Sequence, residues 1–464
     1  MIPLTVRDAA TWAGGELAGI DASAAETVVA AVAVDSRAVP GQSLFVAIRG
    51  ERVDGHDFAE QAVSDGAIAV LSDRALLRAD GTSLPCIVVD DPVLALGRIA
   101  SQVRDRLAAR VVAITGSSGK TSTKDLVAAV LRTAGSTVSP AGSFNTEVGL
   151  PLTVLAADAS TDFLVLEMGM RGLGHIAYLV GLARPDVGVV INVGSAHLGM
   201  LGSREAIAEA KSELVTGLSS DAVAVLNGDD PLVRAMAART QASVLLFGES
   251  ADCDVRAAGV QLDELARPEF DLIHGGESAR VRLRLHGEHY IANALAAAAA
   301  GIACGTSVAQ AAKALSAAEP ASRWRMEVHE SAHGVTVVND AYNANPESTR
   351  AALKTLSSMA HGRRTWAVLG EMRELGDASL EEHDAIGRLA VRLDVSRLVC
   401  VGEGTRVMHL AASNEGSWGE ESIHIPDVDA AIDLLREETR PGDVVLVKAS
   451  RSVGLERVAL ALLE

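Results

Sequence analysis

The residues with the clearest chemical potential stand at 116–122, where the chain reads Gly-Ser-Ser-Gly-Lys-Thr-Ser. They follow the apolar, β-branched run VVAIT and precede a helical pattern over 123–134. Such a loop turns backbone N–H groups inward around phosphate oxygens, and the following helix adds partial positive charge. Lys120 could reach a terminal phosphate, and the Thr121 hydroxyl could bind Mg²⁺. The strict pattern would need glycine where Ile114 stands, so a Gly-Ser turn with a chance lysine is the alternative.

Two polar groups follow other strand-like runs. Glu167 ends FLVLE, and His197 comes just after VVINVGSA. In an open α/β sheet, ligands bind at the carboxyl ends of the strands, so both side chains are expected beside the glycine loop. A carboxylate suits Mg²⁺, which prefers oxygen ligands, and an imidazole suits it less well. Ordinary surface roles for both residues are the alternative.

Lys211 stands on the apolar face of a helix predicted over 204–218. The other members of that face are Ile207, Ala210, Leu214 and Leu218. A lysine there costs free energy unless it is paired or loses its proton. A neutral amine can capture CO₂ to form a carbamate, which would be an anionic Mg²⁺ ligand. The alternative is a lysine whose stem is buried while its ammonium reaches water.

The elements that must position these groups divide the chain into three sections. Residues 1–107 contain short strand-like runs between Gly- and Asp-rich turns, and a helix is expected from 94 to 110. Residues 108–320 alternate buried strands with helices, which predicts a doubly wound parallel sheet. Residues 321–464 repeat that alternation and predict a Rossmann-like unit. The predicted fold class is therefore α/β with three domains.

Composition narrows the class of partner. The formal net charge of −19 argues against nucleic acid, whose phosphates need a basic face. The four cysteines are widely separated, which indicates neither a disulfide framework nor a metal cluster. The N-terminus has no signal-peptide pattern, and the most apolar stretch, 292–304, is too short to span a bilayer. We expect a cytoplasmic monomer that does not insert into membranes.

The variant loop T-G-x-x-G-K-T-S resembles the nucleotide loop of the Mur ligases and of the related folylpolyglutamate synthetases. The order of loop, Glu167, His197 and Lys211 also resembles that family. The resemblance implies that ATP converts a carboxylate to an acyl phosphate, which an amine then attacks. It also implies a magnesium site that includes Thr121, Glu167, His197 and a carbamylated Lys211. The ATP loop would comprise Gly116, Ser117, Ser118, Gly119, Lys120, Thr121 and Ser122.

Further motifs resemble the branch of the family that adds D-alanyl-D-alanine to a UDP-N-acetylmuramoyl tripeptide. They are DSR at 35–37, SFNTEVGLP at 143–151, GEHYIANAL at 287–295, DAYNANP at 340–346 and VKASRS at 447–452. The resemblance implies ATP contacts for Asn293, Asp340, Tyr342 and Asn343, and a γ-phosphate contact for Arg325. It implies substrate contacts for Ser36, Arg37, Asn145, Thr146, Lys448, Ser450 and Arg451. The alternative for Arg37 is an exposed salt bridge, and for Asn145 and Thr146 it is an ordinary turn. For Asn293 the alternative is a polar group at a helix start, and for the other basic residues it is an ordinary solvated charge.

Rival functions remain at this stage. A different Mur ligase or a folylpolyglutamate synthetase is the nearest rival, and DAYNANP together with the DSR section weighs against both. A non-catalytic nucleotide-binding regulator is a rival of another class. The combination of Lys120, Glu167, His197 and Lys211 weighs against it, because such a set suits phosphoryl transfer.

Overall fold

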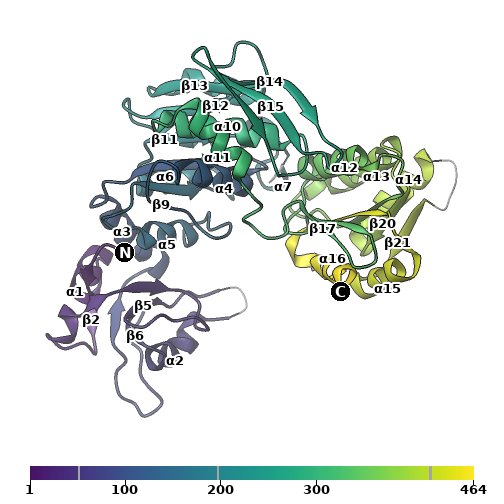
Figure 1. The fold of residues 1–464 in the computed structure, drawn as a ribbon. Helices are drawn as coiled ribbons and strands as arrows, with labels where there is room; N and C mark the ends of the chain where they lie inside the picture. The colour runs from purple at the N-terminus through teal and green to yellow at the C-terminus, as the bar shows by residue number, and fades with distance from the viewer. Residues whose placement is uncertain (51–52, 196–197, 417–420) are drawn as a thin grey trace. The chain divides into compact units, whose positions relative to one another are not determined.

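The computed structural model describes residues 1–50, 53–195, 198–416 and 421–464, so the metal prediction for His197 lies outside the described residues. The chain forms two compact units. The first consists of 1–113, 135–169 and 176–186, and the second of 114–134, 170–175 and 187–464. Figure 1 shows the ribbon and its element labels. The section boundaries after residues 107 and 320 stay predictions.

The first unit contains a five-stranded sheet of order β2-β7-β6-β5-β4. Strands β4 to β7 pair in parallel, and β2 joins β7 antiparallel. The buried runs AIAVLS and SLFV form its central strands, as their mainly apolar composition predicts. The elements are β1 Leu4–Thr5, α1 Val6–Ala13, β2 Glu16–Ala18, η1 Ala24–Glu26, β3 Val28–Val29, β4 Ala31–Ala33, β5 Ser43–Val46, η2 Gly55–Phe58, α2 Ala59–Ser64, β6 Ala67–Ser72, β7 Cys86–Val88 and α3 Pro92–Arg104.

A nine-stranded sheet has the order β16-β15-β14-β13-β12-β11-β8-β10-β9. Its pairs from β11 to β14 are parallel, whereas β14, β15 and β16 pair antiparallel. The strands are β8 Arg110–Thr115, β9 Thr137–Val138, β10 Phe163–Glu167, β11 Val187–Val190, β12 Val223–Asn227, β13 Ser243–Gly248, β14 Val255–Leu262, β15 Pro268–His274 and β16 Glu277–Arg282. The helices are α4 Lys120–Leu131, α5 Gly149–Ala156, α6 His175–Ala183, α7 Leu198–Leu201, α8 Arg204–Thr216, α9 Pro231–Arg234, η3 Ala235–Arg239, α10 Tyr290–Ala303 and α11 Val308–Ala317.

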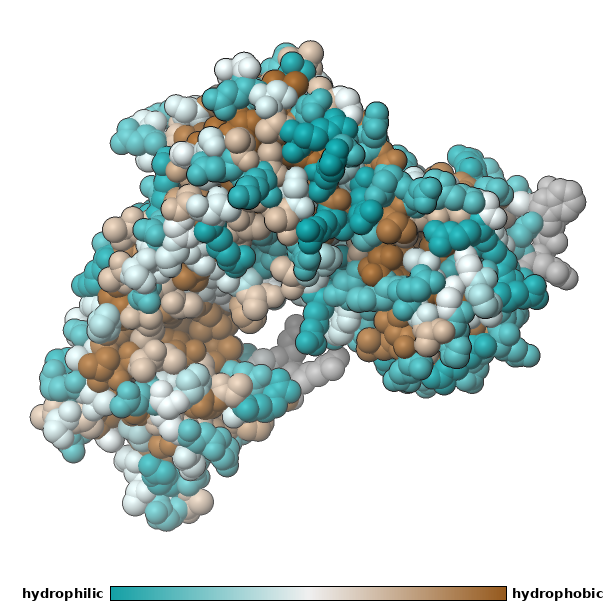
Figure 2. All heavy atoms as spheres, viewed as in Figure 1, coloured by the Kyte–Doolittle hydropathy of each residue, from teal (hydrophilic) through white to brown (hydrophobic). Residues whose placement is uncertain are grey.

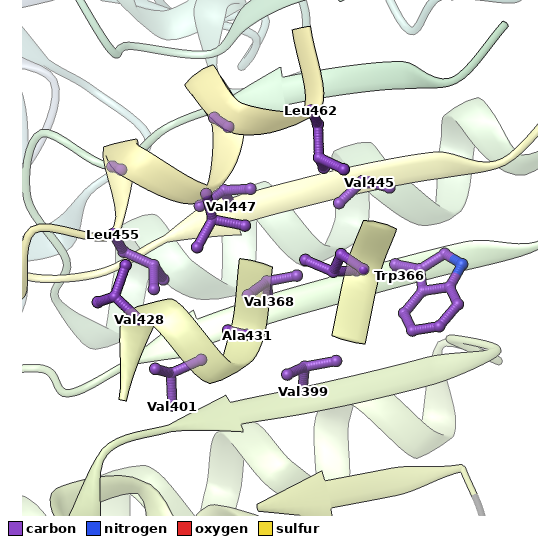
Figure 3. Close-up of a cluster of buried hydrophobic side chains, with 14 of the residues drawn as sticks. Trp366, Val368, Val399, Val401, Val428, Ala431, Val445, Val447, Leu455 and Leu462 are labelled. Carbon is purple, nitrogen blue, oxygen red and sulfur yellow. The ribbon is translucent and has the colours of Figure 1, made fainter. Parts of the chain in front are cut away.

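The C-terminal sheet, in the second unit, has the order β17-β18-β22-β19-β20-β21, and only β17 is antiparallel. Helices α15 and α16 cover one face and α12 to α14 the other (Figure 1). Apolar side chains such as Trp366, Val368 and Leu455 fill the space under α15 and α16 (Figure 3). The elements are β17 Glu327–Glu330, β18 Thr336–Asn339, α12 Pro346–Ala360, β19 Thr365–Gly370, η4 Gly376–Ala378, α13 Ser379–Arg392, β20 Arg397–Val401, η5 Glu403–Thr405, α14 Arg406–Glu415, β21 Ser422–Ile425, α15 Val428–Glu438, β22 Val444–Lys448, η6 Arg451–Val453 and α16 Glu456–Leu463.

Some expected elements have different limits. The helix expected from 94 to 110 is α3, which ends at Arg104, and Arg110 already begins β8. The helix expected over 123–134 begins at Lys120, directly after the glycine loop. The helix expected over 204–218 is α8, which ends at Thr216. The antiparallel strands β14 to β16 were not expected.

Hydrophilic residues dominate the face shown in Figure 2, with smaller hydrophobic patches between them. Within the described ranges, no helix combines the length and the apolar composition that a membrane span requires.

Candidate active site

The glycine loop joins a buried strand to a helix, as its sequence predicts. Strand β8 is buried from Val111 to Thr115, and α4 begins at Lys120. Gly119 occupies the left-handed region with φ +80°, where a side chain is strained, so glycine suits this turn. The first N–H groups of an α-helix point out of its N-terminus, and those of α4 directly follow the loop. The segment therefore has the geometry of an anion-binding helix N-terminus.

Asn192 holds the loop in shape. Its side-chain Oδ1 accepts hydrogen bonds from the Ser117 N–H at 2.9 Å and the Ser118 N–H at 3.0 Å. Its Nδ2 donates to the Ser118 carbonyl oxygen at 3.2 Å. Asn192 follows β11, so it obeys the same rule about strand ends that pointed to Glu167. Asn192 was not predicted as a site residue, although its place after a strand end could have pointed to it.

Two lysines, Lys120 and Lys211, lie near the glycine loop. The Lys120 ammonium donates to the Gly116 carbonyl oxygen at 2.8 Å. Lys211 on α8 is only 1% exposed, so its ammonium does not reach water in this structure. Burial and the nearby charge of Lys120 place the pKa of Lys211 well below its ordinary value. Both causes favour the neutral amine, which is the form that reacts with CO₂.

Arg325 reaches the phosphate loop from the segment before β17. Its guanidinium donates to the Thr121 hydroxyl at 3.0 Å and lies over the Tyr342 ring at 4.2 Å from the centroid. The neighbours Trp324 and Met326 have φ angles of +58° and +51°. Left-handed backbone at two bulky residues costs free energy and clusters at functional sites. The chain thus accepts local strain where it places Arg325 against the loop.

The first turn of α10 borders the other side of the loop. The Asn293 side chain lies so close to Gly119 that a Cβ at this glycine would come within 2.6 Å of its Oδ1. The Tyr290 hydroxyl lies 3.4 Å from the Ser122 hydroxyl, and burial raises the pKa of Tyr290 to about 12. A cavity of about 160 Å³ opens beside Ser122, Tyr290 and Arg325. Asn293 therefore lies next to the loop, as an ATP contact would require.

A second polar cluster lies at the carboxyl ends of β18 and β22. The Lys448 ammonium, 2% exposed, donates to Asp340 Oδ2 at 2.6 Å and to the Asn343 carbonyl oxygen at 2.9 Å. Asp340 Oδ1 accepts the Met326 N–H at 3.1 Å. Because β18 and β22 are parallel neighbours, residues that are 108 apart in sequence meet here. The partly buried His289, whose pKa burial lowers to about 4, was not predicted as a site residue.

Ser450 and Arg451 follow β22 and differ in exposure. The buried Ser450 hydroxyl accepts the Arg373 N–H at 3.0 Å. The half-exposed Arg451 side chain pairs with Glu456 at 2.5 Å and lies over the Trp324 ring at 4.2 Å. Arg451 therefore contacts the residue that precedes Arg325.

The first unit holds the remaining predicted residues, which form two groups. Arg37 has a side chain that is 87% exposed and pairs with Asp35, so the surface salt bridge left open as an alternative is present. Hydrogen bonds from Arg37 lower the pKa of Asp35 to about 2, and Ser36 between them is partly buried. Asn145 instead donates to the buried Glu167 carboxylate at 2.6 Å.

Thr146 supports the loop before α5, because its hydroxyl lies 3.4 Å from the N–H groups of Val148 and Gly149. That contact agrees with the turn role left open for it. Among the described residues, no group of three His, Cys, Asp or Glu side chains could hold a metal ion. The donors named for Mg²⁺ are chemically suitable nevertheless, because a hydroxyl, a buried carboxylate and a carbamate all offer oxygen.

Three family models match successive parts of the chain. "Mur ligase family, catalytic domain" matches residues 28–104, "Mur ligase middle domain" matches 114–301, and "Mur ligase, glutamate ligase domain" matches 324–451. Together they span most of the sequence and include the glycine loop, Lys211 and Arg325. The chain belongs to the Mur ligase family.

Three similar proteins belong to one branch of that family. A UDP-N-acetylmuramoyl-tripeptide--D-alanyl-D-alanine ligase of Mycobacterium leprae is 48% identical, over 99% of this chain and 98% of that protein. The crystal structure I of MurF from Acinetobacter baumannii has a TM-score of 0.88 at 29% identity and covers 99% of both chains. A MurF ligase of Thermotoga maritima in complex with ADP has a TM-score of 0.80 at 30% identity, over 94% of this chain and 97% of that one.

Proposed function

We propose that this chain is the ATP-dependent ligase that joins D-alanyl-D-alanine to a UDP-N-acetylmuramoyl tripeptide in peptidoglycan synthesis. The observation that carries the proposal is the full-length likeness to proteins of that name, 48% identical over 99% of the chain. The contact of Arg325 with Thr121 of the glycine loop supports it, since it brings a cation to the place where phosphate would bind. The ADP complex of a relative supports the nucleotide.

The reaction requires ATP to phosphorylate the terminal carboxylate of the tripeptide. The resulting acyl phosphate is then attacked by the amino group of D-alanyl-D-alanine, and phosphate leaves. Lys120, Arg325 and the loop N–H groups are suited to stabilise charge on the transferred phosphoryl group. The protein thus contributes position and electrostatics.

For the nucleotide, we assign residues 116–122, Asn293, Asp340, Tyr342 and Asn343 to ATP. Asp340 and Asn343 already share Lys448, so a ligand contact at either one is coupled to that ammonium. Mg²⁺, assigned to Thr121, Glu167, His197 and the Lys211 carbamate, would neutralise phosphate charge when bound. The lowered pKa of Lys211 supports the carbamate, because a charged ammonium cannot attack CO₂.

For the other substrates, we assign Ser36, Arg37, Asn145 and Thr146 to the UDP-linked tripeptide. The exposed Arg37 guanidinium is available to a phosphate, although it must exchange part of its contact with Asp35. Lys448, Ser450 and Arg451 are assigned to D-alanyl-D-alanine, whose carboxylate requires a cation. We further propose that the protein acts as a monomer in the cytoplasm, where its nucleotide substrates occur.

The test is the mass of the product. The purified chain is incubated with a UDP-N-acetylmuramoyl tripeptide, D-alanyl-D-alanine, ATP and Mg²⁺. The proposal predicts that the precursor gains one dipeptide with loss of water, while one ATP becomes ADP for each product. Omission of the dipeptide is the control and should give no ligated product. Addition of glutamate to a folate, with no change in the muramoyl precursor, would contradict the proposal.

A further inference from the structure

Glu347 makes a contact that the proposed mechanism does not use. It occupies the first turn of α12, after the capping residue Asn345 and Pro346. Its Oε1 accepts a hydrogen bond from the Ser195 N–H at 2.7 Å. Ser195 is 5% exposed and follows β11, so the contact is buried on that side. A side chain beside the C-terminal sheet thus holds the backbone at a strand end of the nine-stranded sheet.

The space for Glu347 depends on Gly194. A Cβ at position 194 would lie 2.6 Å from Glu347 Cδ and 2.8 Å from its Oε1. Gly194 does not have a positive φ angle, so its backbone does not require glycine. The missing side chain is therefore what allows the carboxylate to reach the Ser195 N–H.

The same contact leads to the phosphate loop. The Gly194 N–H donates to the Ser117 hydroxyl at 2.8 Å, and the Asn345 side-chain amide lies 3.4 Å from the Ser117 carbonyl oxygen. Ser117 also donates its N–H to Asn192, in the same strand-end segment. The first turn of α12 therefore reaches Ser117 both through Gly194 and through Asn345.

We propose that Glu347 is a positioning residue for phosphoryl transfer. By fixing residues 194–195 against α12, it holds the Ser117 part of the loop in one geometry while Arg325 contacts Thr121. Loss of that geometry should slow turnover more than it weakens ATP binding, because transition-state stabilisation depends on small displacements of the donors. The proposal rests on the proposed ligase function.

A purely structural role is the competing explanation. An acidic residue in a first helical turn stabilises the helix through its dipole. However, Glu347 Oε2 is buried and has no hydrogen-bond partner among the described residues. A buried acceptor without a partner costs free energy, so helix stability alone is a poor reason for this placement.

The test compares Glu347→Ala, Glu347→Gln and the exposed control Glu381→Ala in the full chain. Glutamine keeps an oxygen that can accept the Ser195 N–H. We expect Glu347→Ala to lower kcat by at least about tenfold, within the range of a hydrogen bond to a charged acceptor. KM for ATP should change less than about twofold, since loop binding to ground-state ATP is retained. Glu347→Gln should stay near the wild type.

A second variant provides an independent arm. Gly194→Ala should displace Glu347 and reproduce the loss of kcat, and the double variant with Glu347→Ala should be no worse than either single one. Hydrogen exchange gives a readout that does not depend on ligation. The amides of 192–195 and 116–119 should exchange faster in Glu347→Ala than in the wild type, and at the wild-type rate in Glu381→Ala. Should Glu347→Ala not fold, the glutamine and Gly194 variants decide.

Four outcomes overturn the role of Glu347. They are full kcat in folded Glu347→Ala, a Gln variant as poor as Ala, full kcat in Gly194→Ala, or unchanged hydrogen exchange. If the wild-type chain forms no ligated product, the proposed function is contradicted instead. The hydrogen-exchange experiment then still tests whether Glu347 fixes residues 194–195.

Discussion

The phosphate loop and the Asp340–Lys448 cluster satisfy their polar groups in different ways. In the loop, the N–H groups of Ser117 and Ser118 donate to a neutral amide oxygen of Asn192. In the cluster, a buried ammonium and a carboxylate meet at 2.6 Å. Neutral partners can be exchanged for a phosphate at small cost, whereas a buried ion pair is costly to break. The first region is suited to exchange its partners with a ligand. The second is suited to keep the Asp340–Lys448 pair, so a ligand would contact these residues in addition to that pair.

Lys120→Ala should have the largest effect. The variant removes the cation of the phosphate loop and leaves the backbone of the loop in place. Ligation should therefore fall by about 100-fold or more, as for other groups that stabilise charge in a transition state. The thermal midpoint should stay near that of the wild type. Initial rates of ADP release and of product formation measure the effect, with the exposed Lys313→Ala as the control. Near wild-type ligation by the folded variant would show that the loop does not serve ATP.

Asp340→Ala should mainly lower the free energy of unfolding. It leaves the buried Lys448 ammonium without its carboxylate, which typically costs about 3–5 kcal/mol. Urea denaturation measures the free energy of unfolding. The double variant Asp340→Ala, Lys448→Met should recover most of the loss, because no buried charge remains. If Asp340→Ala unfolds like the wild type, the cluster does not keep its partners and the contrast with the loop is wrong.

Lys211→Ala tests the proposed carbamate, which requires the neutral amine rather than a permanently charged ammonium. Ligation by Lys211→Ala should fall by at least about 10- to 100-fold, which is the usual cost of losing even an outer-shell partner of a metal site. A short-chain carboxylic acid in solution should partly restore it, because the acid can occupy the place of the carbamate. Lys211→Arg is the matched variant. Its guanidinium cannot form a carbamate, so ligation should fall by as much as in Lys211→Ala. Unchanged activity in Lys211→Arg would contradict the carbamate.

The sheets could be predicted because their strands are short, continuous apolar runs. The run VVAIT lies in β8, and the similar apolar runs TWAVLG and VVLVK form β19 and β22; all three strands are buried along most of their length. Strands β14 to β16 escaped prediction because they mix exposed and buried positions and carry charges such as Arg280 and Glu269, which pair across the strands. The helix expected to end at 110 stops at Arg104, where its side chain bonds the Ala183 carbonyl oxygen.

The site could be predicted where its residues are contiguous. The glycine loop is one motif, and both its strand and its helix follow from local pattern. The contact of Glu347 with Ser195 could not be found in this way, because it spans 152 residues of sequence. Asn192 could have been found by its place after a strand, but its contact with Ser117, across 75 residues, could not. The substrate contact expected for Asn145 stays a prediction, and the hydrogen bond from its side chain to the Glu167 carboxylate could not be predicted from the sequence. A single sequence gives residue types, but long-range contacts decide which groups meet.

Arg325 tests the distinction between binding and turnover most directly. In the Arg325→Ala variant, equilibrium binding of ATP and steady-state turnover are measured on the same preparation. Because this cation reaches Thr121 from the segment before β17, we expect kcat to fall by about 100-fold while Kd for ATP rises less than about threefold. An equal loss in ATP affinity with no fall in kcat would contradict the account.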